Sequence, residues 1–595
     1  MTQYSHKPLS SRKSIRVLEL QPGQPGDTLR GKLIEVPLTE NTIFDALSYC
    51  WGEPKFDSDF ICDGKIYQVT KSLATALNHI RNINEPITVW IDQLSIDQTN
   101  VDERNSQVQM MGSIFSMARN VLVWLGLSTE ASRYLFDCMR AWRFPTVGMQ
   151  KLMCAVVELY DRPWFERTWT VQEFVLAKHR QKLICGRQRV PWSHFLSYMR
   201  RLDSHTRYRE HSLPITTMPL WSRQDLIRRQ AYHPDTHLEP EWTTTTGRSY
   251  ADVQQTCNAF NSMESIQRNK SYRTLSRLLM WTYKRQATDL RDKVFGLLGI
   301  CEFTNERIHV DYSKTTQRVY SEAMARMILD ECEFAFFGFS FHSSRTPSLK
   351  DLPSWVPDLS DRSHTLPLVM LKDCKPTRAR IKVIREALGS AARQNPIASF
   401  SDDFRILSTR GKESGLITHV LYPIPGKPMH ENWSRWLEWI LPLLRGPWSS
   451  REMIVFLLKD YISEASMASA LQLRNFHLEI KEDQDEERKD DLKDVTDELR
   501  QIFFKGRFSE HHFFATDTFH VGRLIARFEK GPEVGDVLAR LFEIDLPFVL
   551  RKTGDAYTMI SMAHVAGHSY TKRRGDEATS AGVLEENALR EYSII

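Results

Sequence analysis

Hydrophobic and polar positions change their spacing along the chain, and this change marks the first structural boundary. Residues 15–20 and 31–36 are short strand-like stretches on either side of the Pro- and Gly-containing segment Gln21–Asp27. This arrangement is typical of a hairpin. From residue 43 onward, short apolar runs are instead separated by longer segments with helical spacing.

The alternation of short apolar runs and helical segments predicts an α/β domain. We expect strands near 43–50, 87–92, 121–125 and 182–185. A helix is expected over Ser72–Arg81, because Leu73, Leu77 and Ile80 share one helical face. Asn100, followed by Glu103, has the spacing of a helix start. Strands joined by helices of this length form right-handed crossovers, so we expect a mainly parallel sheet of four or five strands with helices on both faces.

The remaining pattern divides the chain into further segments, because 595 residues exceed what one hydrophobic core usually holds. The charge run Glu479–Gln501 is typical of a solvated helix. The expected segments are a hairpin (1–40), an α/β domain (41–200), a polar insertion or loop (201–270), a helical region (271–345), a mixed and mainly helical region with the charged run (346–505) and a small β-rich module (506–595).

Charge and cysteine usage favour a cytoplasmic protein. The 79 Lys and Arg nearly balance the 74 Asp and Glu, which gives no reason to expect a nucleic-acid or acidic-membrane partner. The nine cysteines are dispersed without a CxxC pair, so we expect reduced thiols rather than a disulfide framework. The first twenty residues lack an apolar signal region, and no apolar run approaches the ~20 residues of a membrane helix.

Several common catalytic and metal-binding patterns are missing from the sequence. It contains neither a GxxxxGK[ST] phosphate loop nor a GxSxG nucleophile elbow. His564 and His568 have helical metal-pair spacing but no third ligand, and His511-His512 is equally weak, so we expect no metal site. Gly296-Leu-Leu-Gly299 is too short for a dinucleotide loop and is expected on or just after a helix.

Three ordered motifs resemble the fungal heterokaryon-incompatibility (HET) family. They are FDALSYCWG (Phe44–Gly52), WIDQLSIDQ (Trp90–Gln98) with its following Glu103-Arg104, and PWFERTWTVQE (Pro163–Glu173). The resemblance extends over about 44–190. Weaker similarities lie in DLRDKVFGLLGI (Asp289–Ile300), LPSWVPDLS (Leu352–Ser360) and two segments of the C-terminal module. Ser95 replaces the family's usual cysteine, and the family's C-terminal tip is altered here at His564–Gly567.

The resemblance implies a fold and a candidate catalytic carboxylate. The HET domain is held to be related to TIR domains, which are flavodoxin-like, and Trp169 and Glu173 have the spacing of a TIR-domain Trp and Glu. In NAD-cleaving TIR domains that Glu is catalytic, which makes Glu173 the candidate catalytic residue and NAD a candidate substrate. A carboxylate can stabilise the oxocarbenium-like transition state of ribose–nicotinamide cleavage. No cofactor is otherwise implied.

The loops at the carboxyl ends of the expected strands are the candidate ligand site. Ligands of doubly wound sheets bind at this edge, which singles out Trp51 and Gly52 after the first strand and Asp92 and Asp97 after the second. Each has a structural alternative: Trp51 can pack in the core, Asp can close a turn, and Glu173 can pair with Arg167. We expect Trp164, Phe165 and Trp169 to be mostly buried against the sheet. An exposed Glu173 would favour catalysis, whereas a Glu173 buried in an ion pair would favour scaffolding.

The resemblance leaves three functions open. The first is self/non-self recognition that triggers programmed cell death when unlike fungal cells fuse, with protein partners and possible self-association. The second is NAD(P) glycohydrolysis by Glu173. The third is a non-enzymatic scaffold or regulator that only binds a partner.

Overall fold

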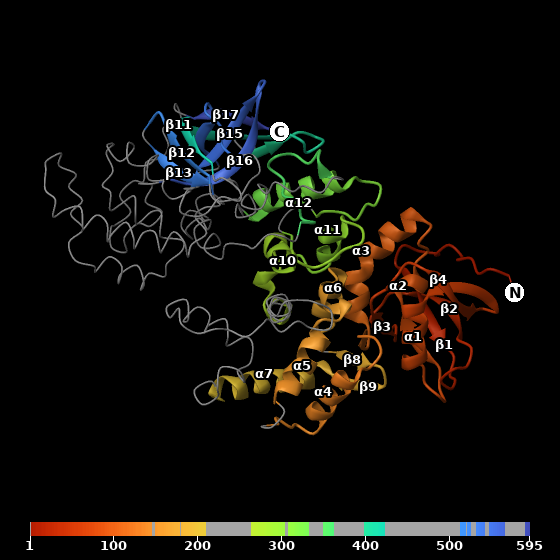
Figure 1. Ribbon diagram of the computed structural model, residues 1–595. Helices are drawn as coiled ribbons and strands as arrows, with labels where there is room; N and C mark the ends of the chain where they lie inside the picture. Colours follow the sequence, from red (N-terminus) through yellow and green to blue (C-terminus); the bar gives the residue numbers. More distant parts are fainter. Residues whose placement is uncertain are drawn as a thin grey trace. The chain divides into compact units, whose positions relative to one another are not determined.

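The structure is a computed structural model, in which two compact units follow one another along the chain (Figure 1). They comprise residues 1–315 and 316–595, and each is described by itself. The residues described are 2–145, 149–178, 180–209, 263–303, 307–331, 349–361, 398–422, 512–518, 520–524, 531–541, 547–565 and 589–595. The charged run Glu479–Gln501 and most of the polar segment 201–270 lie outside them.

The first unit is built on a nine-stranded sheet with the order β5-β4-β2-β1-β6-β3-β7-β8-β9. Its strands are β1 (Ser14–Leu20), β2 (Arg30–Pro37), β3 (Asp45–Ser48), β4 (Phe56–Cys62), β5 (Lys65–Thr70), β6 (Ile87–Trp90), β7 (Val121–Trp124), β8 (Gln181–Cys185) and β9 (Gln188–Pro191). The four strands predicted from the α/β pattern are β3, β6, β7 and β8, and all three pairings among them are parallel.

The prediction of a mainly parallel sheet is wrong for the sheet as a whole, which is mixed. β1 pairs antiparallel with both β2 and β6, so the N-terminal hairpin of 1–40 extends the sheet of the α/β domain. β4 pairs antiparallel with β5, and β8 with β9. Short turns join β4 to β5 and β8 to β9, and such turns permit only antiparallel neighbours, whereas parallel pairing needs a crossover.

Helices cover both faces of the sheet in the first unit. Leu73 and Leu77 of α1 pack with Leu47 and Val89 on one face. On the other face, Trp90 contacts Phe115 of α3, with ring centroids 5.6 Å apart. Successive residues of a strand point to opposite faces of the sheet, so β6 packs Val89 on one face and Trp90 on the other. The helices are α1 (Lys71–Ile80), α2 (Asp92–Ser95), α3 (Val101–Met117), α4 (Glu130–Arg140), α5 (Met149–Tyr160), η1 (Pro163–Glu166), α6 (Trp169–Leu176), α7 (Trp192–Arg209), η3 (Lys270–Tyr272), α10 (Leu275–Thr282) and α11 (Asp292–Leu298).

Helix α3 begins where the sequence predicts. The Asn100 side chain accepts a hydrogen bond from the Glu103 amide at 3.1 Å, as a helix cap requires. The Glu103 carboxylate does not accept a hydrogen bond from the Asn100 amide. It accepts hydrogen bonds from Arg16 and from the Asp97 amide instead. Only half of a capping box is therefore present, because the second half is used in a longer-range interaction.

The second unit contains α12 (Thr316–Glu331) and a ring of antiparallel strands. β11 pairs with β12 and β14, and the ring is completed through β13, β16 and β15. The strands are β10 (Ala398–Phe400), β11 (Leu407–Leu421), β12 (Phe513–Thr516), β13 (Val521–Leu524), β14 (Val537–Leu541), β15 (Phe548–Thr553), β16 (Ala556–Val565) and β17 (Arg590–Ile594). Closing a sheet on itself leaves no open edge within the ring.

The β-rich module also includes β10 and β11, which come from 346–505, the segment expected to be mixed and mainly helical. β11 changes register between Glu413 and Gly415 and again between Ile417 and His419. These irregularities bend the strand and let it pair with different partners along its length. Gly415 has φ +145°, a conformation that L side chains rarely adopt.

Candidate functional site

Glu173 lies at the buried centre of the three sequence motifs. It is on α6, and its side chain accepts a hydrogen bond from the Ser48 hydroxyl at the end of β3. The indole N–H of Trp164 donates to the same hydroxyl oxygen at 2.7 Å. The residue Glu173 is 4% exposed, Ser48 is fully buried, and Trp164 is 1% exposed. The three side chains form one continuous line from indole to hydroxyl to carboxylate.

The motif Pro163–Glu173 places these groups by changing its backbone conformation twice. Pro163 begins the short helix η1, a position where its missing N–H costs nothing. Arg167 is extended (φ −73°, ψ 141°), and α6 then starts in a new direction. Arg162 anchors the motif, because its guanidinium donates to the carbonyls of Leu125 and Leu127 at 2.8 and 2.9 Å.

A half-buried polar rim lies at the carboxyl ends of β3 and β6. The Trp51 indole N–H donates to the Asp92 carboxylate at 2.8 Å, and the Gln93 amide donates to the same side chain at 2.7 Å. The Arg167 guanidinium donates to the Tyr49 carbonyl. Because β3 and β6 are parallel neighbours, their carboxyl ends open on the same edge, where ligands of such sheets bind.

Burial raises the pKa of both carboxyl groups in this cluster. The pKa of Glu173 is raised to about 7, because burial and the charge of Asp92 outweigh the lowering effects of Arg167 and the Ser48 hydrogen bond. Burial likewise raises the pKa of Asp92, against the effects of Arg167 and Trp51. A carboxyl that titrates near neutrality can hold or release a proton under physiological conditions, as general acid–base chemistry requires.

The thiol beside this cluster is poorly suited to act as a nucleophile. Burial raises the pKa of Cys50 to about 11, although Arg167 lowers it. The thiolate is the reactive form of cysteine, so it is scarce here at neutral pH. No disulfide joins the described cysteines Cys50, Cys62, Cys138, Cys154, Cys185 and Cys301.

The predicted ligand residues separate into two groups. Trp51 and Asp92 meet in the rim described above. Gly52 follows Trp51 and is exposed, with φ +71°. Asp97 instead closes a local turn, in which its carboxylate accepts hydrogen bonds from the Thr99 amide and hydroxyl at 3.0 and 2.6 Å. The fold therefore does not place the Asp97 side chain in the hydrogen-bonded pair of Trp51 and Asp92.

Burial of Glu173 bears directly on the choice between catalysis and scaffolding. A carboxylate open to solvent is what we expect of a catalytic residue ready for substrate, and Glu173 is not open. The partner of Glu173 is nevertheless a neutral hydroxyl rather than the ion pair expected of a scaffold. Trp164, Phe165 and Trp169 are 1%, 1% and 8% exposed, which confirms their predicted core positions.

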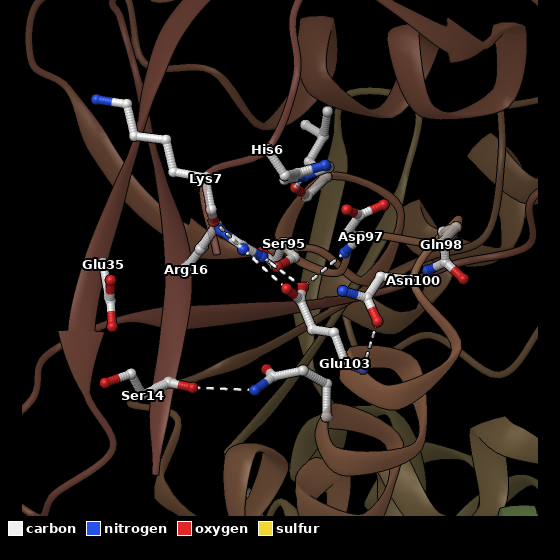
Figure 2. A network of polar contacts seen from close by, with 12 residues as sticks. His6, Lys7, Ser14, Arg16, Glu35, Ser95, Asp97, Gln98, Asn100 and Glu103 are labelled. Carbon is white, nitrogen blue, oxygen red and sulfur yellow. Dashed lines mark hydrogen bonds and ion pairs between the residues drawn. The ribbon is translucent and has the colours of Figure 1, made fainter. Parts of the chain in front are cut away.

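A second polar network, centred on Arg16 and Glu103, was not predicted from the sequence. Figure 2 shows the two side chains facing each other, and the Arg16 guanidinium donates to Glu103 at 2.6 and 2.9 Å. The same guanidinium donates to the carbonyls of Ser95 at 3.0 Å and Lys7. The Asp97 amide donates to Glu103 at 2.8 Å. The network thus fixes the end of α2 and the loop that follows it. The sequence signal for it is an arginine inside the apolar strand β1.

No group of three or more His, Cys, Asp or Glu side chains within the described ranges could hold a metal ion. None of the helices formed by those residues is long and apolar enough to cross a membrane.

The residues of the Glu173 site lie in a range that matches a known protein family. Residues 44–173 match the model of the family described as "Heterokaryon incompatibility protein (HET)". The chain is also similar to heterokaryon incompatibility protein 6, OR allele, of Neurospora crassa, with 25% identity over 418 residues. That alignment covers 58% of this chain, and the chain spans 58% of the length of the relative. No solved structure matches the chain.

Proposed function

We propose that this chain is a member of the heterokaryon-incompatibility family that acts in fungal self/non-self recognition and triggers cell death through its HET domain. The proposal is supported by the family match over residues 44–173 and by the printed name of the Neurospora relative. We place the protein in the cytoplasm, with protein partners and self-association, and with no required cofactor, nucleic acid or membrane.

The observation that carries the proposal is the buried line from Trp164 through Ser48 to Glu173. All three residues belong to the family-matched range, and Ser48 lies more than one hundred residues before the other two in the sequence. A TIR-like mechanism is part of the proposal. It is supported by the parallel strands β6-β3-β7-β8 with helices on both faces. It is also supported by the hydrogen bond between Glu173 and Ser48, the last residue of β3.

Inducible expression in a fungal host tests the proposed role. We expect wild-type protein to arrest growth and reduce viability, and Glu173→Gln to restore growth, because the change removes the charge of the central carboxylate. Glu130→Gln is the matched control, since Glu130 is an exposed residue on α4 whose side-chain partner is Lys151. Growth arrest by Glu173→Gln equal to that by wild type, at equal protein level, would reject Glu173 as the centre of the activity.

NAD(P) glycohydrolysis is the second candidate, and the raised pKa of Glu173 favours it. A carboxyl with a pKa of about 7, near the charged groups of Asp92 and Arg167, resembles the tuned carboxylates of enzymes that cleave glycosidic bonds. Because Glu173 is 4% exposed, turnover would require a rearrangement that opens the site, and we expect self-association to provide it.

The glycohydrolase candidate is tested by following NAD in solutions of the purified full chain over a range of protein concentrations. Loss of NAD by wild type and by Glu130→Gln, but not by Glu173→Gln, would support it. Equal consumption by wild type and Glu173→Gln would exclude Glu173 as the catalytic carboxylate. Growth arrest without NAD loss would favour the third candidate, a non-enzymatic scaffold that recruits a partner.

A further inference from the structure

We infer that Arg285 and Asp292, which lie beyond the family-matched residues, are positioning residues that hold the helix carrying Glu173 in place. Both belong to the first unit of the chain, in the segment that follows the polar insertion. The inference rests on the proposed function in one respect: the Glu173 centre is taken to be the functional centre of the domain.

Arg285 holds the turn that precedes Glu173. Its guanidinium donates to the Arg167 carbonyl at 3.1 Å and to the Thr170 hydroxyl at 3.2 Å. The residue is 3% exposed, and burial lowers the pKa of its guanidinium to about 10. Burial removes the hydration of this guanidinium, and the two hydrogen bonds to the motif replace part of it. The Arg167 backbone is thereby fixed in the orientation that sends its own guanidinium to Tyr49.

Gln286 pairs with the same turn through its backbone. The Thr168 amide donates to the Gln286 carbonyl at 2.9 Å, and the Gln286 amide donates to the Glu166 carbonyl at 2.5 Å. These bonds join residues about 120 positions apart. They extend the contact made by Arg285 into a short parallel bridge beside the motif.

Asp292 holds the start of α6. Its carboxylate accepts a hydrogen bond from the Trp169 indole and another from the Tyr312 hydroxyl, the latter at 2.7 Å. Trp169 is the first residue of α6, and Glu173 lies one helical turn further along. Tyr312 is itself held against α3, because the Arg104 guanidinium lies 4.1 Å from the centre of its ring.

Close backbone packing fixes the distance between α11 and α6. A Cβ at Gly296 would lie 3.2 Å from Thr168 and 3.4 Å from the Trp169 ring. The Gly299 amide donates to the Gln172 side chain at 3.0 Å. Gly296 and Gly299 therefore present backbone without a side chain to α6. The position of Gly296-Leu-Leu-Gly299 at the end of α11 confirms the expectation that it lies on or just after a helix.

These contacts surround the motif from Glu166 to Gln172 but do not touch Glu173. Arg285 and Asp292 therefore act on the carboxylate only through the position of α6. A shift of α6 would move Glu173 away from Ser48 and admit water to it, which would bring its pKa back toward the ordinary value.

The test compares the pH dependence of unfolding in double variants of the full chain. A carboxyl with a raised pKa stabilises the folded state below its unfolded pKa, and the effect is lost as pH rises through the folded pKa. Glu173→Gln should therefore gain in Tm relative to its parent as pH rises from 5 to 8. We expect this pH-dependent gain to fall by half or more when Arg285→Lys or Asp292→Asn is the parent. Both substitutions shorten or neutralise a side chain without adding bulk.

Matched controls separate positioning from general stability. The controls are Arg277→Lys and Asp311→Asn. Arg277 lies on α10 and Asp311 bonds to Ser313, and neither side chain contacts the motif through a described hydrogen bond. Both controls should leave the pH-dependent gain unchanged. If Arg285→Lys and Asp292→Asn lower Tm but leave that gain at its wild-type size, they only stabilise the domain and the inference fails.

A milder variant keeps the test available if Arg285→Lys or Asp292→Asn does not fold. Tyr312→Phe removes only the hydroxyl that donates to Asp292, and we expect a smaller reduction of the same gain. An unchanged gain in Tyr312→Phe would also count against the inference. The growth assay is read separately: absence of arrest by wild type rejects the proposed function, whereas the Tm comparison still decides the positioning role.

Discussion

Glu173 departs from the usual pattern of glutamates, which are almost never fully buried unless they are paired. It is almost completely buried, and its described hydrogen bond comes from a hydroxyl rather than from a cation. Burial penalises the charged form of a carboxyl, and here neither Arg167 nor Ser48 is sufficient to offset it. The result is a carboxyl that changes its charge near neutral pH inside the core.

Replacing Glu173 with glutamine should make stability less dependent on pH. Because the pKa of Glu173 is raised from 4.5 to about 7 on folding, its protonated form stabilises the fold at low pH, and this contribution is lost between those two values. We expect Glu173→Gln to be more stable than wild type above pH 7 by on the order of 3 kcal/mol. Urea unfolding at pH 5 and pH 8 measures the difference. An equal difference at both pH values would show that Glu173 has no raised pKa.

Glu103 should show the opposite pH dependence. Burial alone would raise its pKa, but hydrogen bonds from Arg16 and the Asp97 amide lower it. A lowered pKa stabilises the fold above the unfolded pKa, and this contribution is lost as pH falls through the folded pKa. The side chains of Arg16 and Glu103 are 5% and 9% exposed. We therefore expect Glu103→Gln to cost ~3–5 kcal/mol at pH 7, because it leaves a buried charge unpaired.

Urea unfolding at pH 7 and pH 4 tests the prediction for Glu103, with Glu19→Gln as its control. Glu19 pairs with Lys32 near the surface, and such pairs contribute less than ~1 kcal/mol. The difference between wild type and Glu103→Gln should shrink at pH 4. A loss at pH 7 no larger than that of Glu19→Gln would contradict the role assigned to the Arg16 pair.

At the scale of elements, α6 is held from two directions. On one side its carboxylate meets Ser48 at the end of β3, and on the other its first residue meets Asp292 of α11. The helix has only eight residues, which is too short to be stable by itself. The position of α6 is therefore determined by its packing and by its contacts with Ser48 and Asp292.

Trp169→Ala should destabilise the first unit by ~3–5 kcal/mol, the usual cost of removing a core aromatic side chain. Trp169 is 8% exposed, packs on Gly296 and donates to Asp292, so the change leaves both a cavity and a lost hydrogen bond. Trp142→Ala is a suitable control, because Trp142 is 44% exposed. Chemical unfolding that shows a loss below ~1 kcal/mol for Trp169→Ala would mean that this side chain is not part of the core.

At the scale of the molecule, the structural unit is longer than the family-matched range. The family match ends at residue 173, whereas the first compact unit extends to residue 315. The additional residues contribute Arg285, Gln286 and Asp292 to the turn and helix that carry Glu173. The domain is thus completed by a segment that lies after the polar insertion in the sequence.

A fragment of residues 1–315 should fold, whereas a fragment of residues 1–200 should not unfold cooperatively. The shorter fragment lacks Arg285 and Asp292, and it exposes Trp169 and the turn at Arg167 to water. Circular dichroism during heating measures the two transitions. A cooperative transition of the 1–200 fragment at the temperature of the longer one would show that the later segment is not needed for the fold.

The sequence by itself determined the features that depend on neighbouring residues. The apolar runs predicted β3, β6, β7 and β8, and Asn100 predicted the start of α3, because strand spacing and helix caps act within a few residues. The motif Pro163–Glu173 similarly identified Trp164 and Trp169 as buried.

Only the tertiary structure decided which distant side chains meet. The antiparallel addition of β1 to β6, the hydrogen bond from Ser48 to Glu173 and the contacts of Arg285 with the motif all join segments far apart in the sequence. Such pairs form because burial of a polar group must be compensated by a partner, and the packing of the whole unit selects that partner. The spacing of neighbouring residues does not determine this partner. The sequence could therefore indicate Glu173, but not the residues that bury it and set its charge.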